Sequence, residues 1–311
     1  MGQKDLAQND YFNDKVRFAD VCNGVLFHGN AIIKSEELQE SGADIVYQEE
    51  AGKRRKVIPD KVWKWKGIHI AILTVENQTK IDYSMVFRVM KEEAVSYERQ
   101  WKERECEYKR RGLLPKKAHL CWKGKGEKFT PVITVVIYYG IDKEWDGAVC
   151  LYDLLNVDEE LQPYVTNYKM NLFDYHDCDD FSIFKTENRE LFEMLSCAGD
   201  KDKMGKLISD NHERYSGLSE ETVKTICDIA GINSKWIKTI KSEGMEVVVD
   251  MCKAWDDRKE EGKEEGKEEG SCAAVCMCKN MKVSIQDAIE HIARAFALSK
   301  EISEQKVKLY W

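Results

Sequence analysis

The sequence predicts an α/β protein, in which a mixed sheet flanked by helices is followed by a helical C-terminal region. Three β-type segments at 44–47, 57–65 and 68–76 precede a long amphipathic helix at 84–108, and another β-type run follows at 131–138. This strand–strand–strand–helix–strand order is typical of a mixed sheet with helices on its faces. The second half of the chain carries helical patterns instead.

The other N-terminal elements complete this arrangement. The apolar periodicity of residues 11–27 predicts an amphipathic helix, and residues 28–43 are expected to form a loop with a short polar helical stretch. The polar, glycine-containing stretch 49–55 is typical of a hairpin loop between the first two strands. Lys66-Gly67 is expected to form the turn that leads into the third strand.

Four helices are predicted after the sheet, at 181–197, 201–214, 219–230 and 233–256. The repeat of Gly, Lys and Glu at 262–270 indicates a solvated helix or a linker. A final amphipathic helix is expected at 280–298, with Ser284 as its N-cap, and it is expected to serve docking or homo-oligomer contacts. The predicted units are the sheet domain, a helical region, the charged linker or helix, and a C-terminal helical segment, with bounds at 1–180, 181–258, 259–271 and 272–311.

Composition bounds the environment of the chain. Its 311 residues include 33% charged residues, and it has neither an apolar run of about 18 residues nor a charged-then-apolar N-terminus. No membrane partner and a cytoplasmic location are therefore expected. The eleven cysteines are an odd number without a framework spacing, which favours reduced thiols. The cluster of Cys272, Cys276 and Cys278 lacks the second half of a zinc site.

Charge is distributed unevenly along the chain. The net charge of −8 argues against a dedicated, tightly binding nucleic-acid protein, because phosphate neutralisation dominates such affinity. However, residues 51–66 hold seven Lys and Arg against one acid, and residues 99–128 hold eleven against four. The two basic segments lie on both sides of the third strand, so DNA becomes a candidate partner.

The end of the third strand carries the residues with the most chemical information. Because side chains alternate along a strand, Glu76 and Gln78 project from the same face. Just upstream, Val57-Ile-Pro-Asp60 is a second short apolar segment that ends in an acid. An acid on one strand and an acid-x-polar pair on the next can hold a hard divalent cation beside a water molecule.

These residues belong to a longer pattern. Glu76-Asn-Gln78-Thr-Lys-Ile-Asp82-Tyr83, followed by Phe87-Arg88-Val-Met90 and Tyr97-Glu-Arg-Gln100, resembles the recombination-promoting nuclease / putative transposase family, within the PD-(D/E)XK nuclease superfamily. Further matches are Pro131 to Tyr138, Trp145-Asp-Gly147 and Asn171-Leu-Phe-Asp174, so the resemblance spans roughly residues 8–180. It implies a restriction-endonuclease-like sheet and a nuclease-like domain over residues 1–180.

The resemblance also implies an activity, a cofactor and a ligand set. The expected function is a metal-dependent DNA endonuclease that uses Mg²⁺ or Mn²⁺. The implied metal ligands are Asp60, Glu76 and the backbone carbonyl of Asn77. Gln78 stands where the wider motif has a lysine, and its carboxamide can hold the attacking water by hydrogen bonds but cannot accept its proton. Asp44 is the alternative first acid, because it resembles the strand acid of shorter family members.

Other residues are assigned secondary roles. The family places a polar residue of its first helix in the active site, for which Asp20 is the candidate, and it places Arg88 and Tyr97 near the metal. An arginine at that place would bind a phosphate bidentately. From the basic segments, the candidates for DNA-backbone contacts are Arg54, Arg55, Lys56, Arg110 and Arg111.

A second functional class competes with the enzyme. The acidic net charge and the missing lysine favour a catalytically degenerate relative that acts as a DNA- or protein-binding module. The retained acids Asp60 and Glu76 and the flanking basic segments favour the nuclease. No Gly-x-Ser-x-Gly, Walker-type or His-Glu-x-x-His motif offers another catalytic set.

Overall fold

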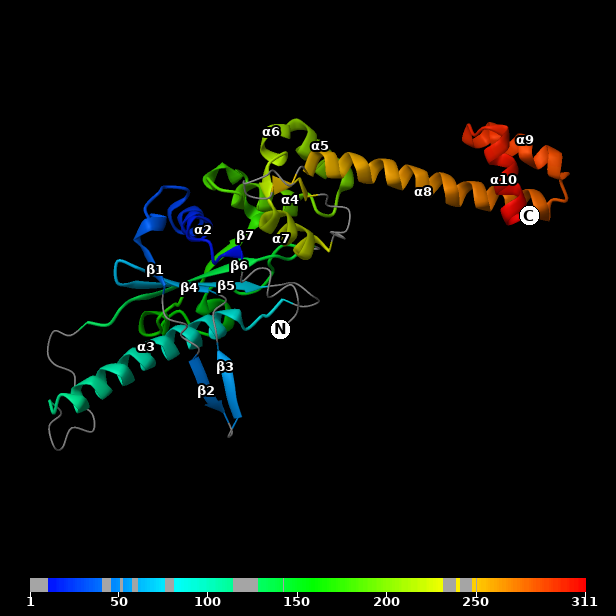
Figure 1. Ribbon diagram of the computed structural model, residues 1–311. Coiled ribbons are helices and arrows are strands. Elements are labelled where there is room, and N and C mark those ends of the chain that lie inside the picture. The colour runs from blue at the N-terminus through cyan, green and yellow to red at the C-terminus, as the bar shows by residue number, and fades with distance from the viewer. Residues whose placement is uncertain are drawn as a thin grey trace.

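A five-stranded mixed sheet forms the centre of the protein, with helix α2 on one side and helix α3 on the other (Figure 1). The computed structural model describes residues 11–40, 46–50, 53–57, 61–75, 81–113, 128–141, 143–231, 239–240, 248–249 and 251–311. The sheet order is β1-β4-β5-β6-β7. The bounds are α2 (Lys15–Phe27), β1 (Leu38–Glu40), β4 (Lys61–Trp65), β5 (Ile68–Val75), α3 (Met85–Arg110), β6 (Val132–Tyr138) and β7 (Asn171–Asp174). The predicted α/β class is confirmed.

The hairpin of β4 and β5 follows from its two-residue turn. Lys66 and Gly67 both have positive φ, at 47° and 80°, which is the backbone that a tight hairpin with right-handed strand twist requires. The strands pair antiparallel from Trp65 opposite Ile68 to Lys61 opposite Ile72. The last three residues of β5, which end at Val75, pair only with β6 in the part of the chain that the structure describes.

Helix α3 is the crossover that makes the next pair of strands parallel. β5 and β6 run parallel, as do β6 and β7, so their carboxyl ends lie at one edge of the sheet. Side chains alternate across β6: Ile137 joins the core on the α2 side, whereas Tyr138 packs with Val89 of α3. The first turns of α3 therefore cover the sheet with the buried residues Met85, Val86 and Val89, whereas Tyr97 and Trp101 farther along are exposed. α3 extends two residues beyond the predicted end.

The first strands differ from the prediction. β2 (Val46–Glu50) and β3 (Lys53–Val57) form a separate two-stranded sheet. The single strand predicted at 57–65 is therefore wrong, because β3 ends at Val57 and β4 begins at Lys61 in another sheet. Part of the predicted loop 28–43 instead forms β1, because Leu38 is buried and its backbone pairs with the open edge of β4.

The helices after β7 pack on the same core as α2. They are α4 (Asn188–Ser196), α5 (Lys201–Asp210), α6 (His212–Tyr215) and α7 (Glu220–Ala230). The predicted helix 233–256 is wrong in its middle, where β10 (Val248–Val249) pairs with both β8 (Leu218–Ser219) and β9 (Thr239–Ile240). The run of valines at 247–249 favours a strand, and β8 offers it a partner.

A long helix, α8 (Met251–Asn280), carries the Gly-Lys-Glu repeat away from the main body (Figure 1). The repeat was predicted to form either a solvated helix or a linker, and the helix is confirmed. The end of α8 packs with α9 (Ile285–Phe296) and α10 (Lys300–Tyr310) around a small core of its own that contains Val275, Ile289 and Val307. Ser284 is the N-cap of α9 as predicted, but α9 is shorter than 280–298 and is not the final helix.

None of the helices in the described ranges is long and apolar enough to cross a membrane. The predicted boundaries at 180/181, 258/259 and 271/272 stay predictions.

Candidate functional site

The predicted metal ligands Asp60, Glu76 and Asn77, the water-binding Gln78 and the alternative acid Asp44 lie outside the described residues. The strands that lead to them are described. β5 ends at Val75, directly before Glu76, and β4 begins at Lys61, directly after Asp60. In register, Val75 lies beside Tyr138 of β6, which lies beside Asp174 of β7. The predicted site therefore adjoins the carboxyl edge of three parallel strands.

Asp174 organises this edge. Its carboxylate is buried, and Oδ2 accepts a hydrogen bond from the Trp145 backbone N–H at 2.6 Å. Oδ1 accepts from the backbone N–H of His176 at 3.0 Å and lies 2.6 Å from its Nδ1. The ring of His176 stacks on Tyr175 with 4.2 Å between centroids. The loop around Trp145 and the end of β7 are thus held together next to the end of β5.

In the sequence, Asp174 stands out only as the last residue of the stretch Asn171-Leu-Phe-Asp174 that matches the family. The pairing of an acid at the end of an apolar strand with a histidine two residues later was the signal that could have identified it. The His176 side chain is 19% exposed, so this pair lies at the edge of the core and not within it.

Asp20 is committed to the fold. Its buried carboxylate accepts from the backbone N–H groups of Lys185 and Thr186, at 2.7 and 3.2 Å. It also accepts from Thr186 Oγ1 at 2.6 Å and from Asn188 Nδ2 at 3.0 Å. Asp20 therefore anchors the segment that begins α4 onto α2.

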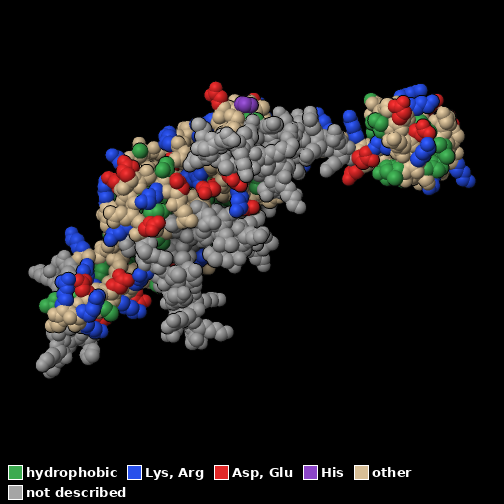
Figure 2. All heavy atoms as spheres, in the orientation of Figure 1, with side chains coloured by type: hydrophobic (Ala, Val, Ile, Leu, Met, Phe, Trp, Pro, Cys, Tyr) green, Lys and Arg blue, Asp and Glu red, His purple; other side chains and the backbone are tan. Residues whose placement is uncertain are grey.

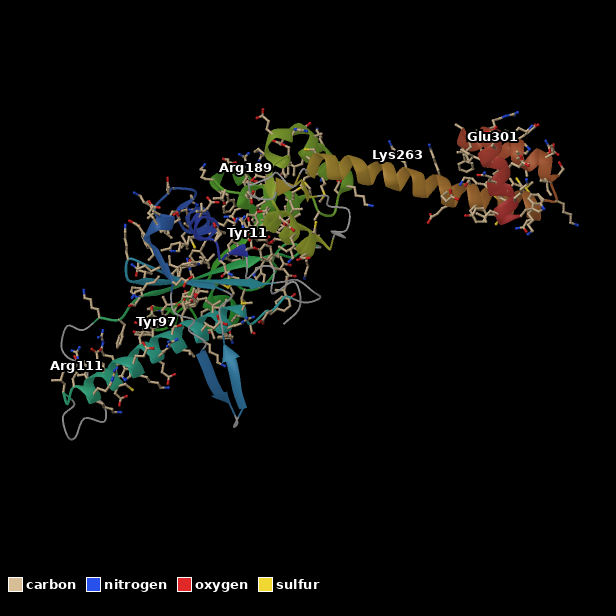
Figure 3. All side chains as sticks on the ribbon, viewed as in Figure 1. Tyr11, Tyr97, Arg111, Arg189, Lys263 and Glu301 are labelled. Carbon is tan, nitrogen blue, oxygen red and sulfur yellow. The ribbon has the colours of Figure 1, made fainter. Side chains whose placement is uncertain are left out.

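Arg88 and Tyr97 both lie on α3. Arg88 Nε bonds Glu92 Oε1 at 3.2 Å, one turn along the helix, and the arginine side chain is 46% exposed whereas Glu92 is 8% exposed. The Tyr97 hydroxyl accepts from the backbone N–H of Val132 at 3.0 Å and so holds the start of β6 (Figure 3). Tyr97 therefore connects α3 to β6, whereas the ion pair of Arg88 lies within α3.

Glu93 is an acid of α3 that the sequence did not single out. Burial against the sheet raises its pKa, although hydrogen bonds with Thr134 and Tyr168 act in the opposite direction. Burial, followed by the charge of Glu93, raises the pKa of Tyr168. Consecutive glutamates in a highly charged helix look like a solvated face, so only the packing of α3 on β6 identifies this pair.

The DNA-backbone candidates fall into two groups. Arg54, Arg55 and Lys56 lie on β3, opposite residues 47–49 of β2, and their side chains lie outside the described parts. Arg110 and Arg111 lie at the C-terminal end of α3, far from the helices of the C-terminal half (Figure 3). Arg111 pairs with Glu107 at 2.8 Å.

No described cysteine forms a disulfide, in agreement with the predicted reduced thiols. Among the residues that the structure describes, no group of three or more His, Cys, Asp or Glu side chains could hold a metal ion. Cys272, Cys276 and Cys278 are among these described residues. The predicted oxygen ligands are outside that set, so metal binding at Asp60 and Glu76 stays a prediction.

The fold defines a mixed α/β protein with a helical C-terminal region, whose parallel strands end at an edge organised by Asp174. The chain belongs to the YhgA-like transposase family: the family model described as "Putative transposase, YhgA-like" matches residues 64–222, which is half of the chain. The match runs from β4 to α7 and includes β5, α3, β6 and β7. The predicted membership of the putative transposase family is confirmed. No curated protein and no solved structure matches the chain.

Proposed function

We propose that this protein is a metal-dependent DNA endonuclease that hydrolyses phosphodiester bonds. The observation that supports the proposal is that β5 ends with Val75 at the carboxyl edge of three parallel strands, and Glu76 is the next residue in the sequence. Open α/β sheets bind ligands at this edge. Membership of a transposase family supports DNA as the partner.

The order of the elements supports a restriction-endonuclease-like core. Helix α2 precedes the antiparallel strands β1, β4 and β5, and α3 then leads to the parallel strand β6. This is the strand–strand–strand–helix–strand order that the sequence predicted, although its first strand is β1 and not residues 44–47.

The donor set fits a hard cation. Asp60, Glu76 and the carbonyl of Asn77 supply oxygen ligands, which Mg²⁺ and Mn²⁺ prefer. A bound cation would neutralise charge that develops on the phosphate and would lower the pKa of a nearby water. Gln78 would orient that water through its carboxamide. The water oxygen adds to phosphorus, one ester P–O bond breaks, and the products are a phosphate monoester and a hydroxyl.

Metal removal should abolish the activity. Purified full-length protein is expected to nick supercoiled plasmid in the presence of Mg²⁺, and excess EDTA should stop the reaction because carboxylates alone cannot neutralise the developing charge. The conversion of supercoiled to open-circular plasmid measures this. DNA binding without nicking in Mg²⁺ or Mn²⁺ would instead identify the protein as a degenerate, DNA-binding relative, as the missing lysine suggests.

Metal binding distinguishes the two candidate first acids. Isothermal titration with Mg²⁺ or Mn²⁺ is expected to show weaker binding for Asp60→Asn and for Glu76→Gln, because each substitution removes one charged ligand. If Asp60→Asn binds as the wild type does and Asp44→Asn does not, Asp44 is the ligand. Unchanged binding by all three variants would mean that the metal site lies elsewhere.

A further inference from the structure

A groove beside α3 joins the two basic segments of the sequence. It has a volume of about 470 Å³ and lies between β4, the second half of α3 and residues 128–130, which lead into β6. Lys64 comes from the segment 51–66, whereas Arg104, Arg110 and Lys128 come from the segment 99–128. We call it the α3 groove. Its other lining residues are Gln100, Glu103, Glu107, Phe129 and Thr130.

The position of Lys64 follows from the alternation of side chains along β4. Trp63 is buried in the core on the α2 side, where its ring lies 6.2 Å from that of Phe18. The next side chain therefore projects from the opposite face of the sheet, toward α3. Lys64 therefore faces the same groove as Arg104 and Arg110 of α3, although about forty residues or more separate them in the sequence.

The acids of the α3 groove are neutralised by arginines, which leaves cations in surplus. Arg99 Nε bonds Glu103 at 2.8 Å, and Glu107 is bonded by Arg104 at 3.1 Å and by Arg111 at 2.8 Å. By contrast, no carboxylate within the described ranges forms an ion pair with the lining cations Lys64, Arg110 and Lys128. Figure 2 shows basic and acidic side chains interspersed at the far end of α3.

The wall of the groove is fixed to α3. The Gln100 side chain bonds both backbone groups of Thr130: Nε2 donates to the carbonyl at 2.9 Å, and Oε1 accepts from the N–H at 2.8 Å. Trp101 stacks on Phe129 with 5.9 Å between ring centroids. Lys128 directly precedes Phe129 and Thr130, so its backbone is held near α3. Little backbone entropy is therefore lost there when a ligand binds.

The α3 groove lies near the start of β5 and not near its carboxyl end. Lys64 pairs with His69 near the start of β5, whereas Glu76 follows Val75 at its end. Six residues of extended strand separate His69 from Val75, which corresponds to about 20 Å. A ligand in this groove would therefore contact the protein at a distance from the bond that is cleaved.

We propose that the α3 groove binds a phosphate of the DNA backbone through Lys64, Arg110 and Lys128, about 20 Å along β5 from its carboxyl end. The position relative to a cut rests on the proposed nuclease function, whereas the binding itself does not. Converging cations without carboxylate partners attract phosphate and give contacts that position the duplex without reading its bases. In this proposal the α3 groove holds the DNA, and the proposed metal site after β5 cleaves it.

The test compares two double variants that each remove two lysines. Lys64→Ala/Lys128→Ala removes cations that line the groove, whereas Lys102→Ala/Lys109→Ala removes exposed lysines of α3 that pair with Glu98 and Glu105 outside it. Fluorescence anisotropy with labelled duplexes of unrelated sequence, in EDTA, measures binding. The groove variant should lose about tenfold in affinity on every duplex, and its salt slope should decrease by about one. The control variant should change by less than about twofold.

Each outcome separates this proposal from the proposed nuclease. If the wild type binds duplex in EDTA and the groove variant binds equally well, or the two double variants weaken equally, the groove proposal is wrong and the nuclease is untouched. A groove effect without plasmid nicking in Mg²⁺ would support the groove and contradict the nuclease. A wild type that binds no duplex in EDTA would overturn the groove proposal, and one that also nicks no plasmid in Mg²⁺ or Mn²⁺ would overturn both. Where nicking occurs, the groove variant should raise KM and leave kcat unchanged, because its lysines do not touch the reacting atoms.

Discussion

Replacing Glu76 with Ala is expected to reduce Mg²⁺-dependent plasmid nicking by a factor on the order of a thousand. Glu76 follows the last residue of β5 and is the proposed ligand that both binds the cation and adjoins the water held by Gln78. Loss of this carboxylate removes a negative ligand, so less cation is bound and less charge on the phosphate is neutralised. Initial rates of open-circular plasmid formation measure the effect.

The matched control is Glu301→Ala, which removes the same side chain from an exposed position in α10 (Figure 3). It should nick as the wild type does. Gln78→Lys should increase the rate, because an amine can orient and polarise the attacking water where a carboxamide can only hydrogen-bond it. Full nicking by Glu76→Ala would show that the activity arises from another site or another protein. A Gln78→Lys variant slower than the wild type would contradict the assignment of Gln78.

Asp20→Ala is expected to lower the free energy of unfolding by about 3 kcal/mol. Its buried carboxylate accepts hydrogen bonds from Lys185, Thr186 and Asn188, and the substitution leaves these donors unsatisfied near the core. For a protein of 311 residues the loss corresponds to a decrease in Tm of about 5 °C. Thermal unfolding monitored by circular dichroism measures it.

Asp14→Ala gives a graded comparison on the same helix. Asp14 is the exposed N-cap of α2 and accepts from the backbone N–H groups of Val16 and Arg17. Its loss should cost only about 1 kcal/mol. Hydrogen exchange should increase at the amides of Lys185 and Thr186 in Asp20→Ala but not in Asp14→Ala. A stable Asp20→Ala variant that has lost nicking would instead place Asp20 in the active site, as the family resemblance implies.

The sequence alone determined the elements that depend on local patterns. Lys66-Gly67 specifies the hairpin of β4 and β5, because glycine reaches positive φ without strain and the turn fixes the register. The apolar face of residues 84–108 predicted α3, and Ser284 predicted the start of α9. The family was also readable, because its motif lies in a continuous stretch from Glu76 to Gln100.

The tertiary structure decided features that depend on partners distant in the chain. β1 and β10 are strands because β4 and β8 present open edges, which local propensity does not encode. The same holds for the separation of β2 and β3 from the central sheet.

The roles of the polar side chains were decided in the same way. The family resemblance made Asp20 a candidate for the active site, yet its carboxylate is buried against residues 185–188. Lys64 and Lys128 lie in separate basic segments, yet they line one groove. Charged side chains are usually solvated at the surface, so their pattern in the sequence does not identify their partners. Only the packing of distant segments decides whether such a side chain has a specific partner or is available to a ligand.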